Sequence, residues 1–205
     1  MPLAASDVER LVAYVRLLER WNATYNLSAI RDPRGIVVHH VLDSLAGAAS
    51  LARHRPSAAT GRLLDVGSGA GLPGLVIAAA CPETEVMCID KVAKKTAFVT
   101  HAAATLGLRN VKALHVAAEA MQGPQFDVIA SRALGSLSRL VSASRHLLAD
   151  QGEWMAMKGK APADELDALR RIAFHVEPLH VPLLHAERCI VWMSLSSSSE
   201  CAHAI

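Results

Sequence analysis

A glycine-rich turn between an apolar strand and an apolar helix constrains the fold of this chain more than any other feature. It reads Asp-Val-Gly-Ser-Gly-Ala-Gly-Leu-Pro-Gly over residues 65–74. Residues 62–66 before it are typical of a short buried strand, and residues 75–80 after it are typical of a helix. Glycine permits a positive φ and lets the backbone approach a ligand closely. The turn therefore predicts an enzyme with a nucleotide-type cofactor pocket.

Two classes of cofactor use such a turn. From Gly69 the pattern is Gly-x-Gly-x-x-Gly, which is the dinucleotide fingerprint and would indicate a nicotinamide-dependent oxidoreductase. From Asp65 the pattern is Asp-x-Gly-x-Gly-x-Gly. A carboxylate there repels a diphosphate but suits the amino group and sulfonium of S-adenosylmethionine. We therefore favour S-adenosylmethionine, with Asp65 and Gly69 at its site, and keep the oxidoreductase and a turn without ligand as alternatives.

The next two predicted strands end in residues that suit a nucleoside. Residues 85–89 lead into Asp90, whose carboxylate is expected to accept hydrogen bonds from ribose hydroxyls, somewhat beyond the usual spacing of about 20 residues. Its alternative role is to cap the following helix. Residues 111–116 are followed by Ala118 and Glu119. Small residues beside a carboxylate would suit an adenine.

Strands and helices alternate beyond a break near Thr60–Gly61. Before the break the chain follows helical spacing, so residues 1–60 are expected to be an N-terminal helical extension on the substrate side. Residues 61–205 are expected to be the methyltransferase domain. Strands are predicted at residues 62–66, 85–89, 111–116, 126–130, 153–157, 174–176 and 189–193. This alternation predicts an α/β fold, a Rossmann-like doubly wound sheet of about seven strands.

Composition and cysteine spacing narrow the class of protein. With 205 residues and 52% hydrophobic content the chain can bury a sizeable core. We expect no membrane association and a cytoplasmic protein, because no run approaches the roughly 20 apolar residues of a membrane span and the start does not resemble a signal peptide. The cysteines show no metal-ligand spacing, so we expect reduced, mostly buried thiols and no metal site. They are Cys81, Cys88, Cys189 and Cys201.

The net charge of +2 is too small to indicate nucleic-acid binding by itself. Basic residues nevertheless recur near predicted strand ends and the loops that follow them. Ligands of open α/β sheets bind outside the carboxyl ends of the strands, so a basic rim there would steer a phosphate-bearing substrate. Ordinary solvated surface charge is the alternative. The residues are Arg31, Arg34, Lys94, Lys95, Arg132, Arg139, Arg145, Lys158 and Lys160.

Polar groups also gather in segments that a bare cofactor domain does not require. We interpret His39 and Asp43 first as hydrogen-bond partners between the two domains, because a metal site or proton relay would need a third group. Arg132 follows the fourth predicted strand, a position that commonly faces the methyl acceptor in nucleic-acid methyltransferases. The chain has neither the Asn/Asp-Pro-Pro-aromatic sequence that holds an exocyclic amine nor a Pro-Cys that attacks a pyrimidine. Arg132 can contact the cofactor's carboxylate, a phosphate, or guanine O6 and N7.

Taken together, these motifs resemble those of the bacterial 16S ribosomal RNA guanine-N7 methyltransferases, also called the glucose-inhibited division protein B family. The resemblance covers nearly the whole chain, with Ser68 and Ala70 replacing the Thr and Pro often seen in the glycine turn. The matching segments are Trp21-Asn22, Tyr25-Asn26-Leu27, His40-Val41-Leu42-Asp43-Ser44, the glycine turn, Ser131-Arg132-Ala133 and Met157-Lys158-Gly159.

The resemblance implies methyl transfer from S-adenosylmethionine to guanine N7 in 16S ribosomal RNA, alone or in the small subunit. It implies a cofactor site made by Gly67, Leu72, Ala118, Glu119 and Arg132, with Asp90 on the ribose. No catalytic acid or base is expected, and Arg132 is a candidate for positioning. We expect a monomer, with substrate contacts from Asn26, His39, Asp43, Arg139 and Lys158. A small-molecule methyltransferase, a methyltransferase of another RNA and a non-catalytic RNA-binding protein are the remaining alternatives.

Overall fold

A seven-stranded mixed sheet organises the protein, in the order β3-β2-β1-β4-β5-β7-β6. The structure is a computed structural model that describes residues 3–56, 61–132, 135–167, 169 and 172–196. The strands β1 to β5 run parallel, whereas β7 is antiparallel to both β5 and β6. The strands are β1 (Arg62–Val66), β2 (Glu85–Asp90), β3 (Val111–His115), β4 (Phe126–Ser131), β5 (Leu148–Lys158), β6 (Ile172–Pro178) and β7 (Cys189–Leu195).

This sheet confirms the predicted seven-stranded fold, and each predicted strand lies within or next to an observed one. The main difference is β5, which begins at Leu148 rather than at residue 153. Its third and fourth residues, Asp150 and Gln151, are polar and exposed, so they interrupt the apolar pattern that would have revealed the start of the strand. The connection reverses direction between β1 and β4, which pair directly. In open α/β sheets such a switch point opens a crevice at the carboxyl ends of the strands.

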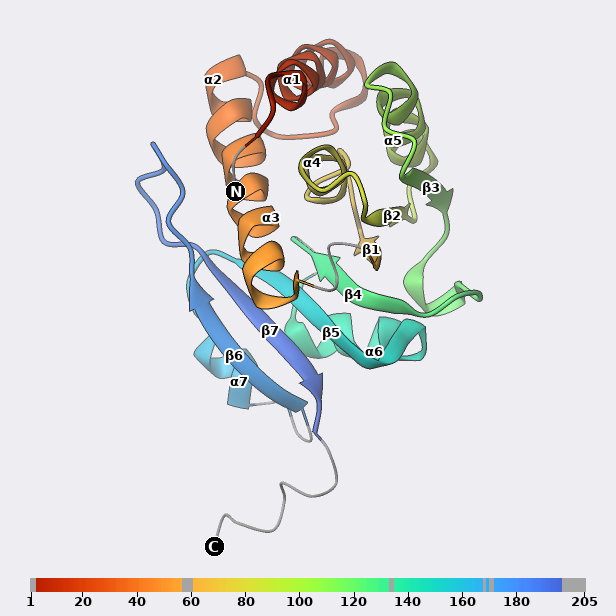
Figure 1. Cartoon of the computed structure of the whole chain (residues 1–205), viewed down its shortest axis with the longest axis vertical. Coiled ribbons are helices and arrows are strands. Elements are labelled where there is room, and N and C mark those ends of the chain that lie inside the picture. The colour runs from red at the N-terminus through yellow and green to blue at the C-terminus, as the bar shows by residue number, and fades with distance from the viewer. Residues whose placement is uncertain (1–2, 57–60, 133–134, 168, 170–171, 197–205) are drawn as a thin grey trace, which may run out of the picture.

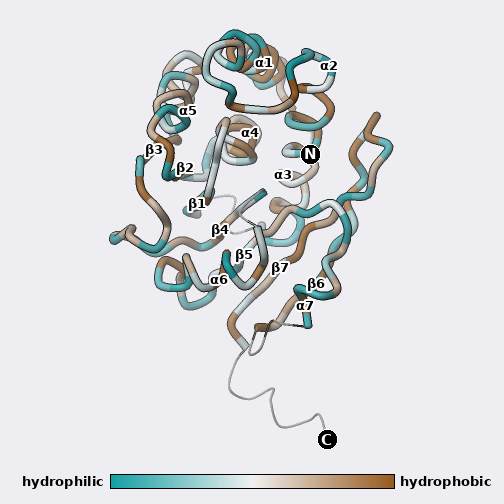
Figure 2. Tube along the Cα trace, turned by 180° about the vertical axis from the view of Figure 1, so that it is seen from behind, coloured by the Kyte–Doolittle hydropathy of each residue, from teal (hydrophilic) through white to brown (hydrophobic). Residues whose placement is uncertain are grey.

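Helices cover both faces of the sheet (Figure 1). On one face lie α1, α3, α4 and α5, and on the other lie α6 and α7. The helices are α1 (Ala5–Tyr25), α2 (Pro33–Ile36), the π-helical turn η1 (Val37–Leu42), α3 (Asp43–His54), α4 (Gly74–Ala80), α5 (Ala93–Thr105), α6 (Leu137–Ser144) and α7 (Ala163–Asp167), with short 3₁₀ turns η3 (Ala118–Ala120) and η4 (Arg145–Leu147). In Figure 2 the hydrophobic colour follows β7 through the sheet.

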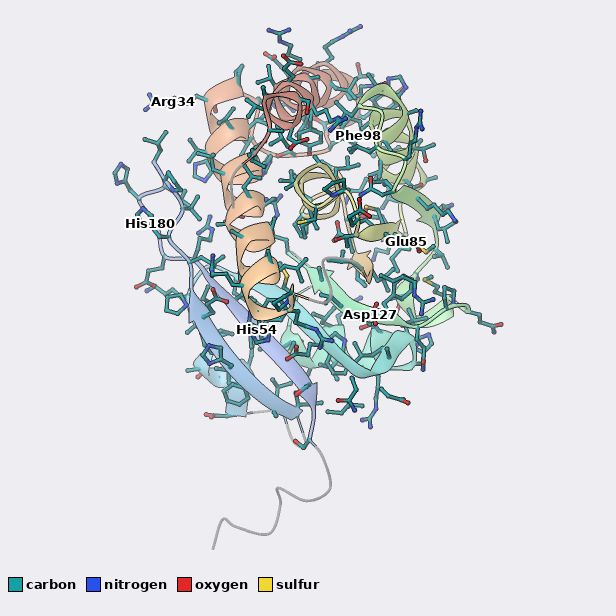
Figure 3. The ribbon with its side chains drawn as sticks, viewed as in Figure 1. Arg34, His54, Glu85, Phe98, Asp127 and His180 are labelled. Carbon is teal, nitrogen blue, oxygen red and sulfur yellow. The ribbon has the colours of Figure 1, made fainter. Side chains whose placement is uncertain are left out.

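One continuous core joins the N-terminal helices to the sheet. Leu18 of α1 and Leu51 of α3 belong to the same buried cluster as Ile77 of α4 and Phe98 of α5. Figure 3 shows Phe98 pointing from α5 toward α1, and its ring centroid lies 6.3 Å from that of Tyr14. The expected domain boundary near residue 60 stays a prediction. The N-terminal helices share one hydrophobic core with the sheet.

The stretch Pro33–His54 forms one helical rod through α2, η1 and α3. Its length and hydropathy meet the criteria for a membrane span, although 56% of its most apolar window is buried inside the fold. Ile36 and Leu51 contribute this burial by packing into the core. The rod therefore has the packing of an interior helix, and the expected absence of membrane association stays a prediction.

Cys81, Cys88 and Cys189 are buried free thiols, as expected, and Cys201 lies outside the described residues. Burial raises the pKa of all three thiols, so they remain protonated and packed as small apolar groups.

Candidate active site

The glycine turn after β1 has the left-handed backbone that its sequence requires. Gly67, Gly69 and Gly71 adopt φ values of 70°, 58° and 79°. A Cβ at Gly71 would stand 2.4 Å from Leu75 Cδ1, so its positive φ coincides with a close contact. The turn can take this path only with glycine at these positions.

Asp65 lies beneath the turn rather than in the wall of a cavity. Its side chain is fully buried, and its Oδ2 accepts a hydrogen bond of 2.9 Å from the Gly74 N–H. Burial raises the pKa of Asp65 to about 7, opposed by the Gly74 hydrogen bond and by the Arg132 charge. Among the described residues, Asp65 Oδ1 and Ser68 Oγ are buried without a hydrogen-bond partner. Neither residue lines the cavity at this edge of the sheet, so a direct contact between Asp65 and the cofactor stays a prediction.

A cavity of about 340 Å³ opens at the carboxyl ends of β1, β2 and β3, and we call it the cofactor cavity after the residues predicted to line it. It brings together four residues predicted for the cofactor, Gly67, Asp90, Ala118 and Glu119. Its size falls within the usual range for a small-molecule site. The other lining residues are Val66, Ile89, Lys91, Val92, Lys95, Val116, Ala117, Gly135, Arg139 and Ala143. Carboxylates next to small and apolar walls fit an adenosine, whose ribose donates hydrogen bonds and whose base is flat.

Asp90 is placed at this cavity, where its contact with a ribose stays a prediction, and it does not cap α5, whose N-cap residue is Val92. It lines this cavity, and it also fixes the backbone, because Oδ2 accepts from Gly69 N–H at 3.0 Å and Oδ1 from Val92 N–H at 2.9 Å. Lys95 Nζ lies 3.7 Å from Oδ2. Gly69 thus contributes through Asp90, whereas Leu72 is buried in the core and lies outside the cavity lining.

A second cavity, of about 380 Å³, lies beside the ends of β4 and β5. We call it the acceptor cavity. It contains Arg132 and three of the predicted substrate residues, His39, Asp43 and Lys158. The other lining residues are Ile30, His40, Met157, Gly159, Leu179, Arg188 and Cys189. A narrow space of about 30 Å³ shares Gly135 with the cofactor cavity and Arg132, Met157 and Lys158 with the acceptor cavity, so the two cavities are neighbours.

Arg132 is tied to the helical rod. Its Nη1 donates to the His39 carbonyl at 3.1 Å and approaches Asp43 Oδ2 at 3.4 Å, while Nη2 lies 3.2 Å from His40 Nδ1. The expected hydrogen bonding between the two halves of the chain is therefore present, although His39 contributes its carbonyl rather than its ring. Arg132 is absent from the lining of the cofactor cavity, so its contact with the cofactor stays a prediction.

Two residues of the acceptor cavity were missed in the sequence. His40 contacts Arg132, and Arg188 donates from Nε to Asp43 Oδ1 at 3.0 Å. His40 lies in a segment that carries the resemblance, but its polar neighbours are far away in sequence. Arg188 precedes β7, whose antiparallel pairing sets Cys189 opposite Lys158. Recognising the last strand as antiparallel would have placed its first residues, and Arg188 just before them, beside the carboxyl end of β5.

The remaining predicted substrate residues lie in different places. Arg139 of α6 lines the cofactor cavity. Lys158 donates to the Gly135 carbonyl at 2.7 Å and to Glu165 at 3.0 Å. Asn26 ends α1 in the left-handed conformation, with its Oδ1 accepting from Arg31 at 2.6 Å, and it lines neither cavity. A contact between Asn26 and substrate stays a prediction.

Comparisons with known proteins agree with this arrangement. A family model described as rRNA small subunit methyltransferase G (GidB) matches residues 7–191. Two relatives named ribosomal RNA small subunit methyltransferase G come from Acidovorax sp. (strain JS42), 49% identical, and Polaromonas naphthalenivorans (strain CJ2), 52% identical. Each match covers 94% of this chain and 89% of the relative.

Two solved structures share the fold at low sequence identity. One is the 1,6-didemethyltoxoflavin-N1-methyltransferase of Burkholderia thailandensis, solved with bound S-adenosylhomocysteine, which is 14% identical with a TM-score of 0.60 over 96% of this chain and 93% of the other. The other is TrmN from Thermus thermophilus, 22% identical with a TM-score of 0.58 over 72% of this chain and 48% of the other.

Proposed function

Because the chain belongs to the rRNA small subunit methyltransferase G (GidB) family, we propose that it transfers the methyl group of S-adenosylmethionine to N7 of one guanine in 16S ribosomal RNA. The observation that carries the proposal is the pair of neighbouring cavities at the carboxyl edge of the sheet. One has the lining of a nucleoside site, and the other is basic and of a size for a base.

The cofactor cavity would hold S-adenosylmethionine through residues that suit each part of it. Asp90 is placed to accept hydrogen bonds from the ribose hydroxyls, and Ala118 and Glu119 are placed beside the adenine. Gly67 lets the backbone come close at the start of the turn. When bound, the cofactor supplies a methyl group on a sulfonium, which a nucleophile can attack directly. The roles of Leu72 and Arg132 toward the cofactor rest on the family resemblance.

The acceptor cavity would hold the guanine. N7 already carries a lone pair, so no base has to remove a proton, and positioning at about 3 to 3.5 Å supplies most of the rate. Burial and the nearby Arg132 charge lower the pKa of His40 to about 4, so the imidazole is uncharged at neutral pH. An uncharged ring avoids adding repulsion as the purine becomes positively charged. Arg132, Lys158 and Arg188 would orient the base or its phosphates.

We expect a monomer, because residues of one chain complete both cavities, and a cytoplasmic protein, because ribosomal RNA is its proposed substrate. Light scattering of the purified protein tests the oligomeric state. The target nucleotide and the choice between naked RNA and an assembling particle are decided by the following assay.

The decisive experiment follows labelled methyl from S-adenosylmethionine into small ribosomal subunits and naked 16S RNA from a strain lacking this gene. The proposal expects label at one guanine, identified as N7-methylguanosine by mass and by N7-specific strand cleavage. Label in cell extract that survives ribonuclease would instead support a small-molecule acceptor. Cofactor binding with no transfer to any RNA would overturn the proposed substrate.

A further inference from the structure

We infer that His40 is a positioning residue, which holds the Arg132 guanidinium at the junction of the cofactor and acceptor cavities through its ring nitrogen Nδ1. The inference rests on the proposed function, because Arg132 needs a fixed orientation only if a cofactor and an acceptor meet there. It assigns a role to a side chain that lies outside the expected contact residues.

The hydrogen-bond chemistry of arginine determines which nitrogen of His40 carries the proton. Arginine has only donors, so Nδ1, which lies 3.2 Å from Arg132 Nη2, must present its lone pair. The proton then sits on Nε2, which lies 2.7 Å from Ser28 Oγ. Ser28 Oγ is itself fixed by the Ile30 N–H at 3.1 Å. Nδ1 also lies 3.1 Å from the His39 carbonyl, to which a ring protonated on Nε2 cannot donate, but that carbonyl already accepts from Arg132 Nη1. The ring is therefore held at both nitrogens, and the Nε2 tautomer is the one that satisfies the Arg132 and Ser28 contacts.

The charges around the ring keep it in this accepting state. His40 is 9% exposed, and its pKa is lowered to about 4 first by burial and then by Arg132. The other charged or titratable groups facing it are His39 on the same turn and Asp43, which pairs with both Arg132 and Arg188. Protonation would turn Nδ1 into a donor pointing at a guanidinium, which would break the contact.

The backbone of the rod supplies a second acceptor beside the ring. His40 lies in the π-helical turn η1, after which the Asp43 N–H donates to the His40 carbonyl instead of the His39 carbonyl. The His39 carbonyl accepts from Arg132 Nη1 at 3.1 Å. Short π-helical turns occur often at functional sites because they change which groups face a ligand. Here the turn places a carbonyl and an imidazole of consecutive residues against one guanidinium.

Arg188 fixes the third acceptor. It donates from Nε to Asp43 Oδ1 at 3.0 Å, while the other oxygen of Asp43 faces Arg132 at 3.4 Å. The carboxylate is therefore oriented from behind by Arg188. Three acceptors from one rod thus surround Arg132. Of these, the His40 acceptor is the one that can be removed by substitution with a side chain of similar shape.

Two substitutions at His40 separate this role from simple packing. Asparagine places its amide oxygen near the position of Nδ1 and can still accept from Arg132, whereas glutamine reaches the position of Nε2 and bonds Ser28 instead. We expect His40→Gln to lower kcat about 10- to 100-fold, the range for losing a hydrogen bond to a charged group, while His40→Asn retains most of the activity. The assay is steady-state methyl transfer to unmethylated small subunits, which gives kcat, with S-adenosylhomocysteine affinity measured by calorimetry.

A matched control and a double mutant complete the kinetic test. The control is His146, whose Nε2 lies 3.0 Å from the Met121 carbonyl. If the loss at His40 comes from its contact with Arg132, His146→Gln should leave kcat unchanged. In an Arg132→Lys background, His40→Gln should cost much less than in the wild type, because both changes remove one interaction. Equal activities of the Gln and Asn variants with unchanged melting temperatures, or additive losses in the double mutant, would overturn the inference.

Nitrogen NMR of the histidine rings tests the inference without any methyl transfer. The ¹⁵N shifts of His40 at pH 7 should show a neutral ring protonated on Nε2, and Arg132→Lys should perturb the Nδ1 resonance. A ring protonated on Nδ1 would contradict the inference even in an active enzyme. Conversely, if the NMR shifts are as expected but the protein methylates no RNA, the proposed function is overturned and the assigned contact between His40 and Arg132 stands.

Discussion

Asp65 is a buried carboxyl group whose protonation differs between the folded and unfolded chain. Its ordinary carboxyl pKa is about 3.9, and burial raises the folded value to about 7. Between these values the folded state binds the additional proton. The free energy of unfolding therefore falls as the pH rises from about 4 to about 7.

Asp65→Asn should remove this loss of stability while keeping an oxygen for the Gly74 N–H. Urea denaturation of the wild type and variant at pH 5 and pH 8 measures the effect, and the difference between the two pH values should be smaller in the variant. The same substitution at the exposed Asp164 controls for the loss of a carboxyl group. An unchanged pH dependence in Asp65→Asn would contradict the assigned pKa shift.

Gly74 shows how closely the turn packs onto the sheet. A Cβ there would stand 2.7 Å from Cys88 Sγ and 2.8 Å from Asp65 Oδ2. We expect Gly74→Ala to destabilise the protein by about 1–3 kcal/mol, the usual cost of overpacking, and Cys88→Ala to recover part of the loss in a double variant. Gly159→Ala is the control, because its nearest neighbour would lie 4.0 Å away. Equal unfolding free energies for both alanine variants would refute the packing argument.

The helix α1 is fastened directly to the glycine turn. Tyr14 is buried, and its hydroxyl donates to the Ala70 carbonyl at 2.8 Å. Through this contact a helix remote in sequence fixes the glycine turn, whose Gly67 lines the cofactor cavity.

Tyr14→Phe should cost about 1–3 kcal/mol of stability, because the Ala70 carbonyl is left buried without a donor. It should also weaken S-adenosylhomocysteine binding, since the turn loses one fixed point. Urea denaturation and calorimetry measure the two effects. Tyr25→Phe, at a side chain 41% exposed, is the matched control and should change neither. Full stability of Tyr14→Phe would show that the hydroxyl contact is dispensable.

The helix α3 is joined to the antiparallel end of the sheet through Glu177 of β6. Its carboxylate accepts from Ser50, from Arg53 at 2.8 Å and from Trp192 at 3.1 Å. Burial alone would raise its pKa, but these hydrogen bonds and the Arg53 charge outweigh burial and lower the pKa. Stability from this group is therefore present above its ordinary pKa and is lost as the pH falls below it.

We expect Glu177→Gln to lose about 1–2 kcal/mol at pH 7 and to show a smaller further loss on acidification than the wild type. Urea denaturation at pH 7 and pH 4 gives both values. Glu187→Gln, at an exposed glutamate before β7, controls for the change in net charge. If Glu177→Gln lost as much unfolding free energy between pH 7 and pH 4 as the wild type, the acid sensitivity would come from other groups.

Across the whole molecule, the direction of the parallel strands separates the edge that carries the cofactor and acceptor cavities from the opposite edge. The cofactor and acceptor cavities both lie at the carboxyl ends of the strands, where Lys160 follows β5. Arg109 lies at the opposite edge, just before β3. Lys160 and Arg109 are both exposed and both positively charged, so they differ only in the edge of the sheet at which they lie.

If RNA docks on the carboxyl edge, Lys160→Ala should reduce the slope of log affinity against log salt by about one, because one phosphate contact is lost. Arg109→Ala should leave the slope unchanged. Binding of a 16S ribosomal RNA fragment at several KCl concentrations measures both. A reduced slope for Arg109→Ala alone would place the RNA on the amino edge.

Local features of the chain were sufficient to predict the scaffold and the cofactor turn. The positive φ of Gly67, Gly69 and Gly71 follows from the absence of a Cβ, and the strands follow from short apolar runs between turns. Asp90, Ala118 and Glu119 could be placed at the cofactor cavity because parallel strands bring their carboxyl ends to one edge. These properties depend on neighbouring residues and on the direction of the strands.

The surroundings of Arg132 depend on packing between segments far apart in the sequence. His40 meets Arg132 across 92 positions, and Arg188 meets Asp43 across 145. The same distinction explains Asp65, whose carboxylate points beneath the turn because the Gly74 N–H and the packed interior lie there. Residue types and local spacing specify the backbone, whereas the direction and charge state of a buried polar side chain are set by partners that only folding brings within hydrogen-bond distance.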